Sequence, residues 1–170
     1  MLNGDGGNDR IFGGAAGDVI NGGLGDDRLA GGGSNDALDG GEGNDVLFGG
    51  DGIDRLIGGE GDDFLFGQQG NDLLAGSEGD DVLNGNDGND RFLIELGNDR
   101  LVGGEGLDRM AIVIATEFDF DVDRVGSNFR LTDIREERSA IFSGTDFLID
   151  LEELEFLDDV IRSPGELASR

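Results

Sequence analysis

Twelve aspartates recur at every ninth position of this sequence, and their carboxylates are the groups in it best suited to chemistry. A regular series of carboxylates suits a hard cation, because Ca²⁺ takes six to eight oxygen ligands from carboxylates and backbone carbonyls. We therefore expect these side chains to bind metal. The series consists of Asp9, Asp18, Asp27, Asp36, Asp45, Asp54, Asp63, Asp72, Asp81, Asp90, Asp99 and Asp108.

The composition excludes several other kinds of site. The chain has no Cys and no His, which excludes disulfides, zinc bound by Cys or His, and a Ser-His-Asp triad. All 12 basic residues are Arg, against 39 Asp and Glu, and the net charge is −27. Such a charge repels nucleic acid and attracts cations. We expect no nucleic-acid partner and, because no run of ~18 apolar residues occurs, no membrane span.

Glycine and apolar residues follow the same period of nine. Gly stands five residues before each Asp, except at Ile94, and two residues before it, except at Ala16 and Ser34. An apolar residue follows each Asp by two positions. Twelve nonapeptides of the form G-G-x-G-[N/D]-D-x-L-x thus fill residues 4–111 without an insertion, and residues 40–48 are a clean copy.

The spacing within each repeat predicts a coiled strand-and-turn structure. The glycine- and Asx-rich residues predict a turn, and the last three residues predict a short strand whose leucine points inward. Two such strands facing each other form a coil of 18 residues, and six coils stack at ~4.8 Å.

Asp27, Asp45 and Asp63 then align, and each neighbouring pair repels by about 1 kcal/mol in water. The bare chain should therefore be disordered until cations bind the turns. Among the cations, Zn²⁺ prefers Cys or His ligands and Mg²⁺ keeps its waters, so Ca²⁺ fits best.

The repeat closely resembles the nonapeptide of the repeats-in-toxin (RTX) family over 108 of the 170 residues. The resemblance implies an all-β fold, a right-handed parallel β-roll, in which Ca²⁺ lies between each turn and the next turn on the same side. The repeat Asp of both turns would ligate the ion, and turn carbonyls would complete its shell. Two stacks of six turns give 5 + 5 = 10 sites at most. The implied carbonyl ligands lie around Gly13, Gly22, Gly25, Gly31, Gly40, Gly43, Gly49, Gly52, Gly58, Gly61, Gly67, Gly70, Gly76, Gly79, Gly85 and Gly88.

Two other interpretations of the array remain open, a flexible acidic spacer and a solenoid that needs no metal. Departures from the consensus predict weaker turns within the array. The repeat at residues 94–102 lacks both leading glycines, so the site between Asp81 and Asp99 should be the weakest. The other departures are Ala16, Ser34, Ile53, Gln68, Ser77, Asn86 and Leu107.

The period stops after Met110, and we expect residues 1–111 to form the roll and residues 112–170 a separate C-terminal region. Phe118, Phe120 and Val122 alternate with aspartates, which predicts a strand, and a turn at residues 126–128 predicts a second strand returning through Phe129 and Leu131. Residues 144–161 resemble the segment that often follows RTX repeats. That resemblance implies a small β-rich cap and a signal for type I secretion. The acidic run from Asp146 to Asp159 predicts a solvated face, with a further metal site as the alternative.

The resemblance implies a calcium-binding module that folds outside the cell and supports the secretion of a larger protein. No signal peptide is evident at the N-terminus, so we expect export by type I secretion machinery. The chain offers no set of catalytic residues, and we expect it not to be an enzyme. The alternatives are an adhesion or surface-layer module, or the non-catalytic C-terminal part of a secreted protease, lipase, epimerase or haemolysin.

One outer face of the roll should carry an apolar patch. Because alternate repeats share a sheet, all four outward Phe residues fall on the same sheet, and Phe48 should stack on Phe66 one coil away. The patch could be covered by the tail around Phe118 and Phe120, by an upstream domain or by a second copy of the chain, or it could simply be exposed. The four residues are Phe12, Phe48, Phe64 and Phe66.

Overall fold

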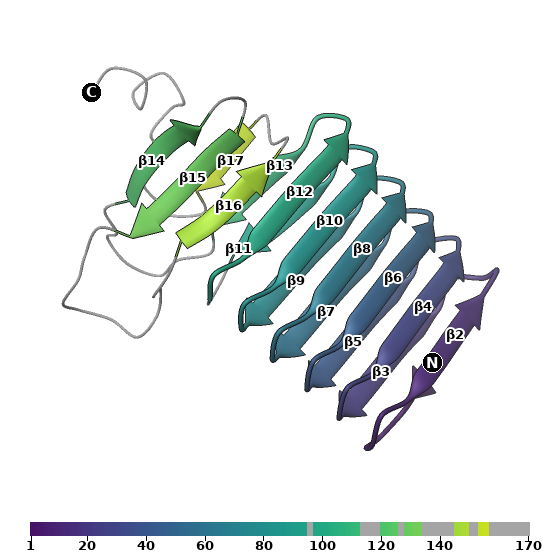
Figure 1. The fold of residues 1–170 in the computed structure, drawn as a ribbon. Helices are drawn as coiled ribbons and strands as arrows, with labels where there is room; N and C mark the ends of the chain where they lie inside the picture. Colours follow the sequence, from purple (N-terminus) through teal and green to yellow (C-terminus); the bar gives the residue numbers. More distant parts are fainter. Residues whose placement is uncertain (95–96, 113–119, 126–127, 134–144, 150–152, 157–170) are drawn as a thin grey trace.

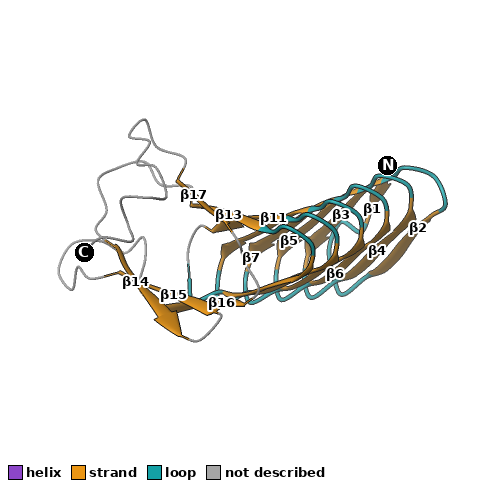
Figure 2. Ribbon diagram, turned by 90° about the horizontal axis from the view of Figure 1, so that it is seen from above, coloured by secondary structure: helices purple, strands orange, loops and turns teal. Residues whose placement is uncertain are grey.

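A computed structural model describes residues 1–94, 97–112, 120–125, 128–133, 145–149 and 153–156. Every regular element in these ranges is a β-strand, and the strands form two sheets that face each other across a thin core (Figures 1 and 2). The chain crosses from one sheet to the other after each repeat. The architecture is therefore the parallel β-roll that the sequence predicts. No helix in the described part of the chain is long and apolar enough to cross a membrane.

The two sheets take alternate strands of the roll. The eight-stranded sheet contains, in spatial order, β1 (Leu2–Asn3), β3 (Val19–Leu24), β5 (Ala37–Glu42), β7 (Arg55–Glu60), β9 (Leu73–Glu78), β11 (Arg91–Ile94), β13 (Arg109–Ile112) and β17 (Glu153–Phe156). The nine-stranded sheet contains β2 (Arg10–Gly14), β4 (Arg28–Gly33), β6 (Val46–Asp51), β8 (Phe64–Gln69), β10 (Val82–Asp87), β12 (Arg100–Glu105), β16 (Thr145–Ile149), β15 (Asn128–Asp133) and β14 (Phe120–Val125).

The strands of the repeats are longer than the three residues expected from the sequence. Most of them have six residues, and β7 runs from Arg55 through Gly58 and Gly59 to Glu60. The two glycines stay within the ladder, where Gly59 pairs with Gly41 and Ser77 at φ +122°. The turn is therefore confined to the three residues that end in the repeat Asp.

The backbone keeps a positive φ at four of the positions where another residue replaces the consensus glycine. Ser34, Gln68, Ser77 and Asn86 all have positive φ, between 72° and 82°. This region costs a residue with a side chain roughly 1–2 kcal/mol, whereas glycine enters it readily. The pairing between coils therefore imposes a positive φ on Ser34, which lies in a turn, and on Gln68, Ser77 and Asn86, which lie within strands β8, β9 and β10.

The core is a double row of single apolar side chains, one from each repeat. Eleven of the twelve predicted core residues are buried, from Ile20 to Met110, and Ile11 is half-buried at the open end of the roll. The register aligns each core residue with the one 18 positions away, as Leu38 pairs with Leu56. Leu2, which stands nine residues before Ile11, adds a short strand that pairs with β3 and packs on the core.

The tail extends both sheets. β14 and β15 form the expected antiparallel hairpin, while β16 pairs in parallel with β12 and β17 in parallel with β13. In this register Leu148 aligns with Leu101, and Leu154 aligns with Met110. Phe118 and the turn at residues 126–127 lie outside the described residues.

Each leucine of the core is hard to replace, because every repeat contributes only one core side chain. Leu56→Ala removes a fully buried side chain and should lower the free energy of unfolding by about 2–5 kcal/mol. Leu24→Ala, at a side chain that is 53% exposed, is the matched control and should change it by less than ~0.5 kcal/mol. Urea unfolding at a fixed saturating calcium concentration measures both values, and equal losses would contradict the core assignment.

Candidate metal sites in the turns

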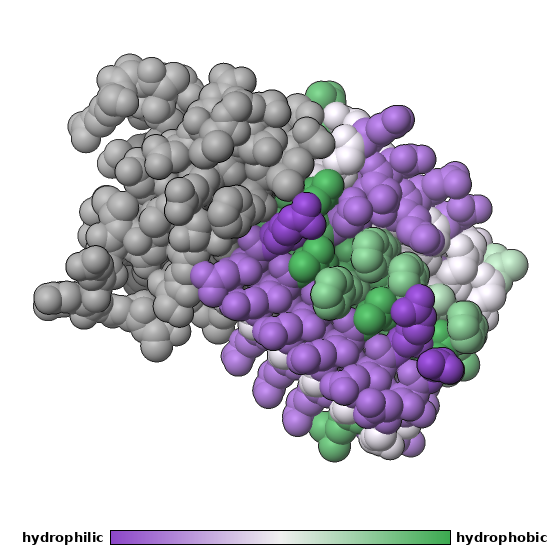
Figure 3. All heavy atoms as spheres, viewed as in Figure 1, coloured by the Kyte–Doolittle hydropathy of each residue, from purple (hydrophilic) through white to green (hydrophobic). Residues whose placement is uncertain are grey.

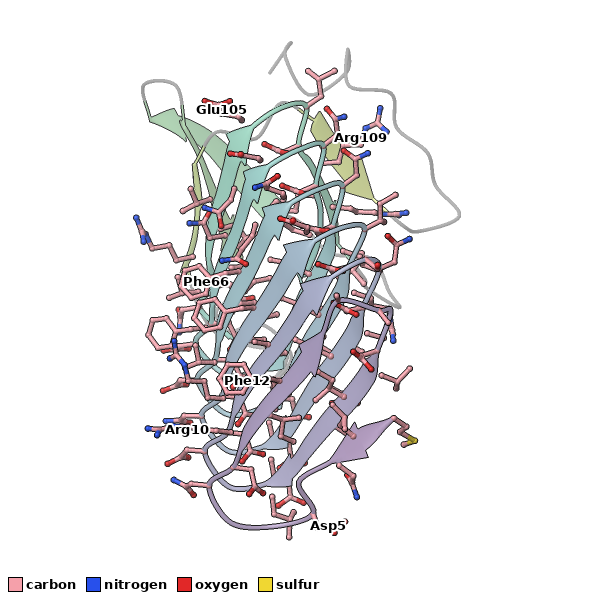
Figure 4. All side chains as sticks on the ribbon, turned by 90° about the vertical axis from the view of Figure 1, so that its right-hand side faces the viewer. Asp5, Arg10, Phe12, Phe66, Glu105 and Arg109 are labelled. Atoms are coloured by element: carbon pink, nitrogen blue, oxygen red, sulfur yellow. The ribbon has the colours of Figure 1, made fainter. Side chains whose placement is uncertain are left out.

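The repeat aspartates stand at the ends of the turns, directly before each strand begins. They form two columns along the roll, because each Asp lies beside the Asp 18 residues away. Ten of the twelve are buried, Asp27 and Asp36 and every later member, with at most 4% of the residue exposed. The side chains on the turns and on the outer faces of the sheets are seen in Figure 4.

One oxygen of each carboxylate in a column is fixed by the coil before it. The amide of Asp45 donates to Oδ1 of Asp63 at 2.7 Å, and the amide of Asp63 donates to Oδ1 of Asp81 at 2.8 Å. The same bond joins ten consecutive pairs, five in each column, at 2.7–3.1 Å. The longest links Asp81 to Asp99, the pair expected to be weakest. This ladder orients the ten carboxylates from Asp27 onward in the same way.

The second oxygen of these carboxylates is buried without a hydrogen-bond donor. A buried carboxylate oxygen without a partner costs several kcal/mol, and such groups are rare unless they have a role. The affected atoms are Oδ2 of Asp9, Asp27, Asp36, Asp45, Asp54, Asp63, Asp72, Asp81 and Asp90.

Glycine at the first position of each repeat leaves room for two oxygens that approach each other. A Cβ placed on Gly58 would stand closer than 3.0 Å to Oδ2 of Asp63, and 2.6 Å from the carbonyl oxygen of Gly76. The same two approaches recur in the repeats beginning at Gly4, Gly13, Gly22, Gly31, Gly40, Gly49, Gly67 and Gly85. A carboxylate oxygen and a backbone carbonyl oxygen therefore converge at each of these turns.

The structure separates the predicted carbonyl ligands into two groups. The carbonyls of Gly22, Gly31, Gly40, Gly49, Gly58, Gly67, Gly76 and Gly85 lie beside the carboxylate oxygens. Of the other eight, seven approach the equivalent glycine of the next coil, as Gly25 O approaches Gly43, and the carbonyl of Gly13 belongs to neither group. The second group comprises the carbonyls of Gly25, Gly43, Gly52, Gly61, Gly70, Gly79 and Gly88.

Burial makes the carboxylates of the columns hard to ionise in the bare fold. Desolvation raises the pKa of Asp63 and Asp72 to about 7, against the opposing effect of the backbone amide that each accepts, and nearby carboxylates add to the rise. The same causes raise the pKa of Asp81 and Asp90 to about 6. The pKa values of Asp45 and Asp54 are also raised. Without a cation, the columns are therefore a source of instability near neutral pH.

A second side-chain ladder runs along the outer edge of the turns, and the sequence analysis missed it. The residue before each repeat Asp is usually Asn or Asp, and its Oδ1 accepts the amide one coil later. Asn44 Oδ1 accepts from the amide of Asp62 at 3.0 Å, and Asp62 Oδ1 accepts from the amide of Asp80 at 2.9 Å. This direction is opposite to that of the inner ladder. The Asn or Asp of the consensus was the signal for it, since these side chains readily bond to nearby amides.

The donor set suits a hard cation. No group of three or more His, Cys, Asp or Glu side chains in the described ranges could hold a metal by itself. A cation here would have to combine carboxylates with backbone carbonyls, a mixture that Ca²⁺ accepts at six to eight positions. The buried Oδ2 atoms and the adjacent carbonyls are oxygens of these two kinds, so the residues fit calcium.

Comparison with known families agrees with this geometry. The sequence model of the RTX calcium-binding nonapeptide repeat, which spans four copies, matches residues 3–38, 12–47, 39–74, 66–93 and 95–111. These matches cover more than half of the 170 residues, and the chain belongs to the RTX calcium-binding nonapeptide-repeat family. A search of curated proteins finds no match.

The glycine at the first repeat position should not tolerate a side chain. Gly58→Ala brings Cβ against Asp63 Oδ2 and the Gly76 carbonyl and should destabilise the fold by about 1–3 kcal/mol. Gly33→Ala is the matched control, because its nearest neighbour would be 3.8 Å away and the change should be neutral or slightly stabilising. Calcium titrations followed by circular dichroism should show a raised midpoint for the first variant only. Similar midpoints for the two variants would contradict the convergence of oxygens at Gly58.

Acid should stabilise the calcium-free fold. The raised pKa values mean that the folded state binds protons more tightly than the unfolded chain, so the free energy of unfolding should fall as pH rises from about 4 to about 7. Far-UV circular dichroism in calcium-depleted buffer should therefore show a coil near pH 8 and more β-structure near pH 5. In saturating calcium the trend should reverse, because protons compete for the ligands. A calcium-free chain that is more stable near pH 8 would refute the burial of ionisable carboxylates.

Proposed function

We propose that this chain is a calcium-dependent folding module of a secreted protein, in which the turns hold Ca²⁺ between successive coils. The observation that supports this most directly is the series of buried Oδ2 atoms without a donor, with a glycine carbonyl beside most of them. Membership of a calcium-binding repeat family supports the same proposal.

The twelve repeat aspartates would ligate calcium, together with carbonyls from the first glycines of the repeats. In each inner pair the backbone amide holds Oδ1 and leaves Oδ2 for the cation, so the ligand is oriented before binding. When bound, calcium supplies the positive charge that the columns lack. The repeats carry 24 acidic residues and 6 Arg, a net charge of −18, and ten Ca²⁺ would contribute +20.

Binding at this scale would decide whether the roll folds. One site adds about 1.4 kcal/mol to stability when free calcium is ten times its dissociation constant. Ten such sites add ~14 kcal/mol, which is comparable to the whole stability of a typical domain. The chain would therefore stay unfolded where calcium is scarce and fold where it is abundant.

This dependence suits a protein that is exported unfolded. The roll of residues 1–111 would fold after release by type I secretion machinery, and the region of residues 112–170 would cap its last coil. Strands β16 and β17 support the capping role, because they add to the exposed edges of β12 and β13. The export signal is proposed for the same region. We propose no catalytic role for the described residues. Any activity of the larger protein would reside in another part of it.

Calcium should convert the chain from coil to β-structure. Far-UV circular dichroism in excess chelator should show a coil, and added Ca²⁺ should produce a cooperative change to a β spectrum, because interior aspartates are shared between neighbouring sites. Asp63→Asn should raise the calcium midpoint more than Asp9→Asn, since Asp9 begins its column and Asp63 lies within it.

Magnesium provides the control. Mg²⁺ at equal concentration should not replace calcium, because it keeps its own waters and demands a smaller octahedral site. A full β spectrum in chelator, or equal shifts of the calcium midpoint for the Asp63 and Asp9 variants, would contradict the proposal.

A further inference from the structure

The outer surface of the nine-stranded sheet carries an apolar patch in the middle of an otherwise polar face (Figure 3). We call Val46, Phe48, Phe64 and Phe66, which lie on the neighbouring strands β6 and β8, the Phe patch. Phe64 is 47% exposed. Phe66 projects from the same face as Phe12 and Arg10 (Figure 4).

The rings of the Phe patch are packed against one another and against an arginine. Phe48 and Phe66 stack with ring centroids 5.1 Å apart and an angle of 8° between the planes. The guanidinium of Arg28 lies 4.6 Å from the centroid of the Phe48 ring, a cation–π arrangement. The sequence predicted the ring stack but not the arginine.

In one row of outward side chains, Arg28 and Arg100 stand on either side of three apolar positions. The register continues to Arg10 beyond Arg28 and to Phe147 beyond Arg100. The parallel register aligns Arg28 with Val46, Val46 with Phe64, Phe64 with Val82, and Val82 with Arg100. We call these five residues the Arg-to-Arg column. Four strand spacings of ~4.8 Å separate its ends, a distance of ~19 Å.

Three arginines on the repeat strands of this sheet have no acidic partner in residues 1–94 and 97–112, although the chain carries 39 acidic residues. Arg10, Arg28 and Arg100 are all exposed, and no ion pair joins any of them to a carboxylate in residues 1–94 and 97–112. In strands β2, β4, β6, β8, β10 and β12, the outward positions next to the core residues contain no carboxylate. They are Arg10, Phe12, Arg28, Ala30, Val46, Phe48, Phe64, Phe66, Val82, Asn84, Arg100 and Val102.

Neither the described tail nor a second copy suits this face. Strand β14, which carries Phe120, lies five positions along the sheet from β8 and so does not cross the Phe patch. A second copy docked symmetrically would place arginines against arginines. The face is also small, because five strands at ~4.8 Å and ~20 Å of strand length give roughly 400 Å², half of the ~800 Å² per partner of a stable interface.

We propose that the Arg-to-Arg column and the adjoining Phe patch bind an extended segment of another protein, with apolar side chains between two acidic ends. Six steps of an extended chain at ~3.3 Å span ~20 Å, which matches the separation of Arg28 and Arg100. Acidic ends meet the two unpaired guanidiniums, and the apolar centre covers the exposed Phe64. The surface exists only when the coils are stacked, so this proposal rests on the proposed calcium-dependent folding.

Labelled heptapeptides test the proposal on the full chain in saturating calcium. The probe is Asp-Val-Phe-Val-Phe-Val-Asp, capped at both ends and joined to a fluorophore, and the control peptide has Lys at both ends. Fluorescence anisotropy should show at least about tenfold tighter binding of the acidic peptide, because each end exchanges attraction for repulsion. Arg28→Gln with Arg100→Gln should remove most of that preference, and added salt should weaken it.

Variants of single surface residues separate the column from the rest of the molecule. Phe64→Ser should weaken binding about tenfold, whereas Phe12→Ser on the same sheet and Arg55→Gln on the other sheet should change it by less than about twofold. Circular dichroism of each variant at the same calcium concentration shows whether the roll is folded. A failure of calcium to induce β-structure would overturn the proposed function.

Three results with a folded roll would overturn only the docking proposal. The first is equal binding of the acidic and Lys-ended peptides. The second is acidic-peptide binding that survives both Phe64→Ser and the double arginine variant. The third is a dimer in sedimentation velocity that Phe64→Ser converts to monomer, which would assign the face to a second copy.

Discussion

Like charges stacked at the spacing of a β-sheet are the constraint on which this structure depends. A coil of 18 residues buries its leucines only if every turn lies directly on the turn of the coil before, and that register also places each repeat Asp on another Asp. The core cannot be built without the charge columns, because both follow from the same period. Burial then raises the pKa values of Asp63 and Asp72. Ionisation of these carboxylates near neutral pH therefore destabilises the calcium-free roll. A cation between the coils would remove the conflict, and a glycine carbonyl lies beside most of the buried Oδ2 atoms.

The two side-chain ladders differ in direction and in burial. In the inner ladder the carboxylate accepts a hydrogen bond from a backbone amide through Oδ1, and its Oδ2 has no donor. In the outer ladder Asn44 and Asp62 accept amides in the opposite direction, at exposed positions that need no metal. The outer ladder links successive turns along their edge, and in the proposed function the inner ladder would present the ligands. Glycine at the first repeat position serves the inner ladder through the absence of a side chain.

Much of this arrangement could be predicted from residue types and spacing. The core column, the alternation of sheets and the stack of Phe48 on Phe66 all follow from a period that keeps one leucine inward per repeat. The strand length did not follow, because Gly58 and Gly59 look like turn residues although they stay in the ladder. Leu2 was missed for a simpler reason, since only its distance from Ile11 marks it as a core position. The tail has no period, so its pairing with β12 and β13 depends on contacts that no local pattern encodes.

The number of calcium ions bound per folded chain tests the central claim most directly. Ten hydrogen bonds of the inner ladder, five in each column, each join a repeat Asp to the repeat Asp of the next coil. Each joined pair is one proposed calcium site. Equilibrium dialysis with radioactive calcium, on a chain shown by circular dichroism to be folded, should therefore approach ten ions per chain, with the site at Asp81 and Asp99 filling last. A folded roll that binds no calcium, or only one or two ions, would show that the stacked carboxylates are stabilised in another way and would contradict the account.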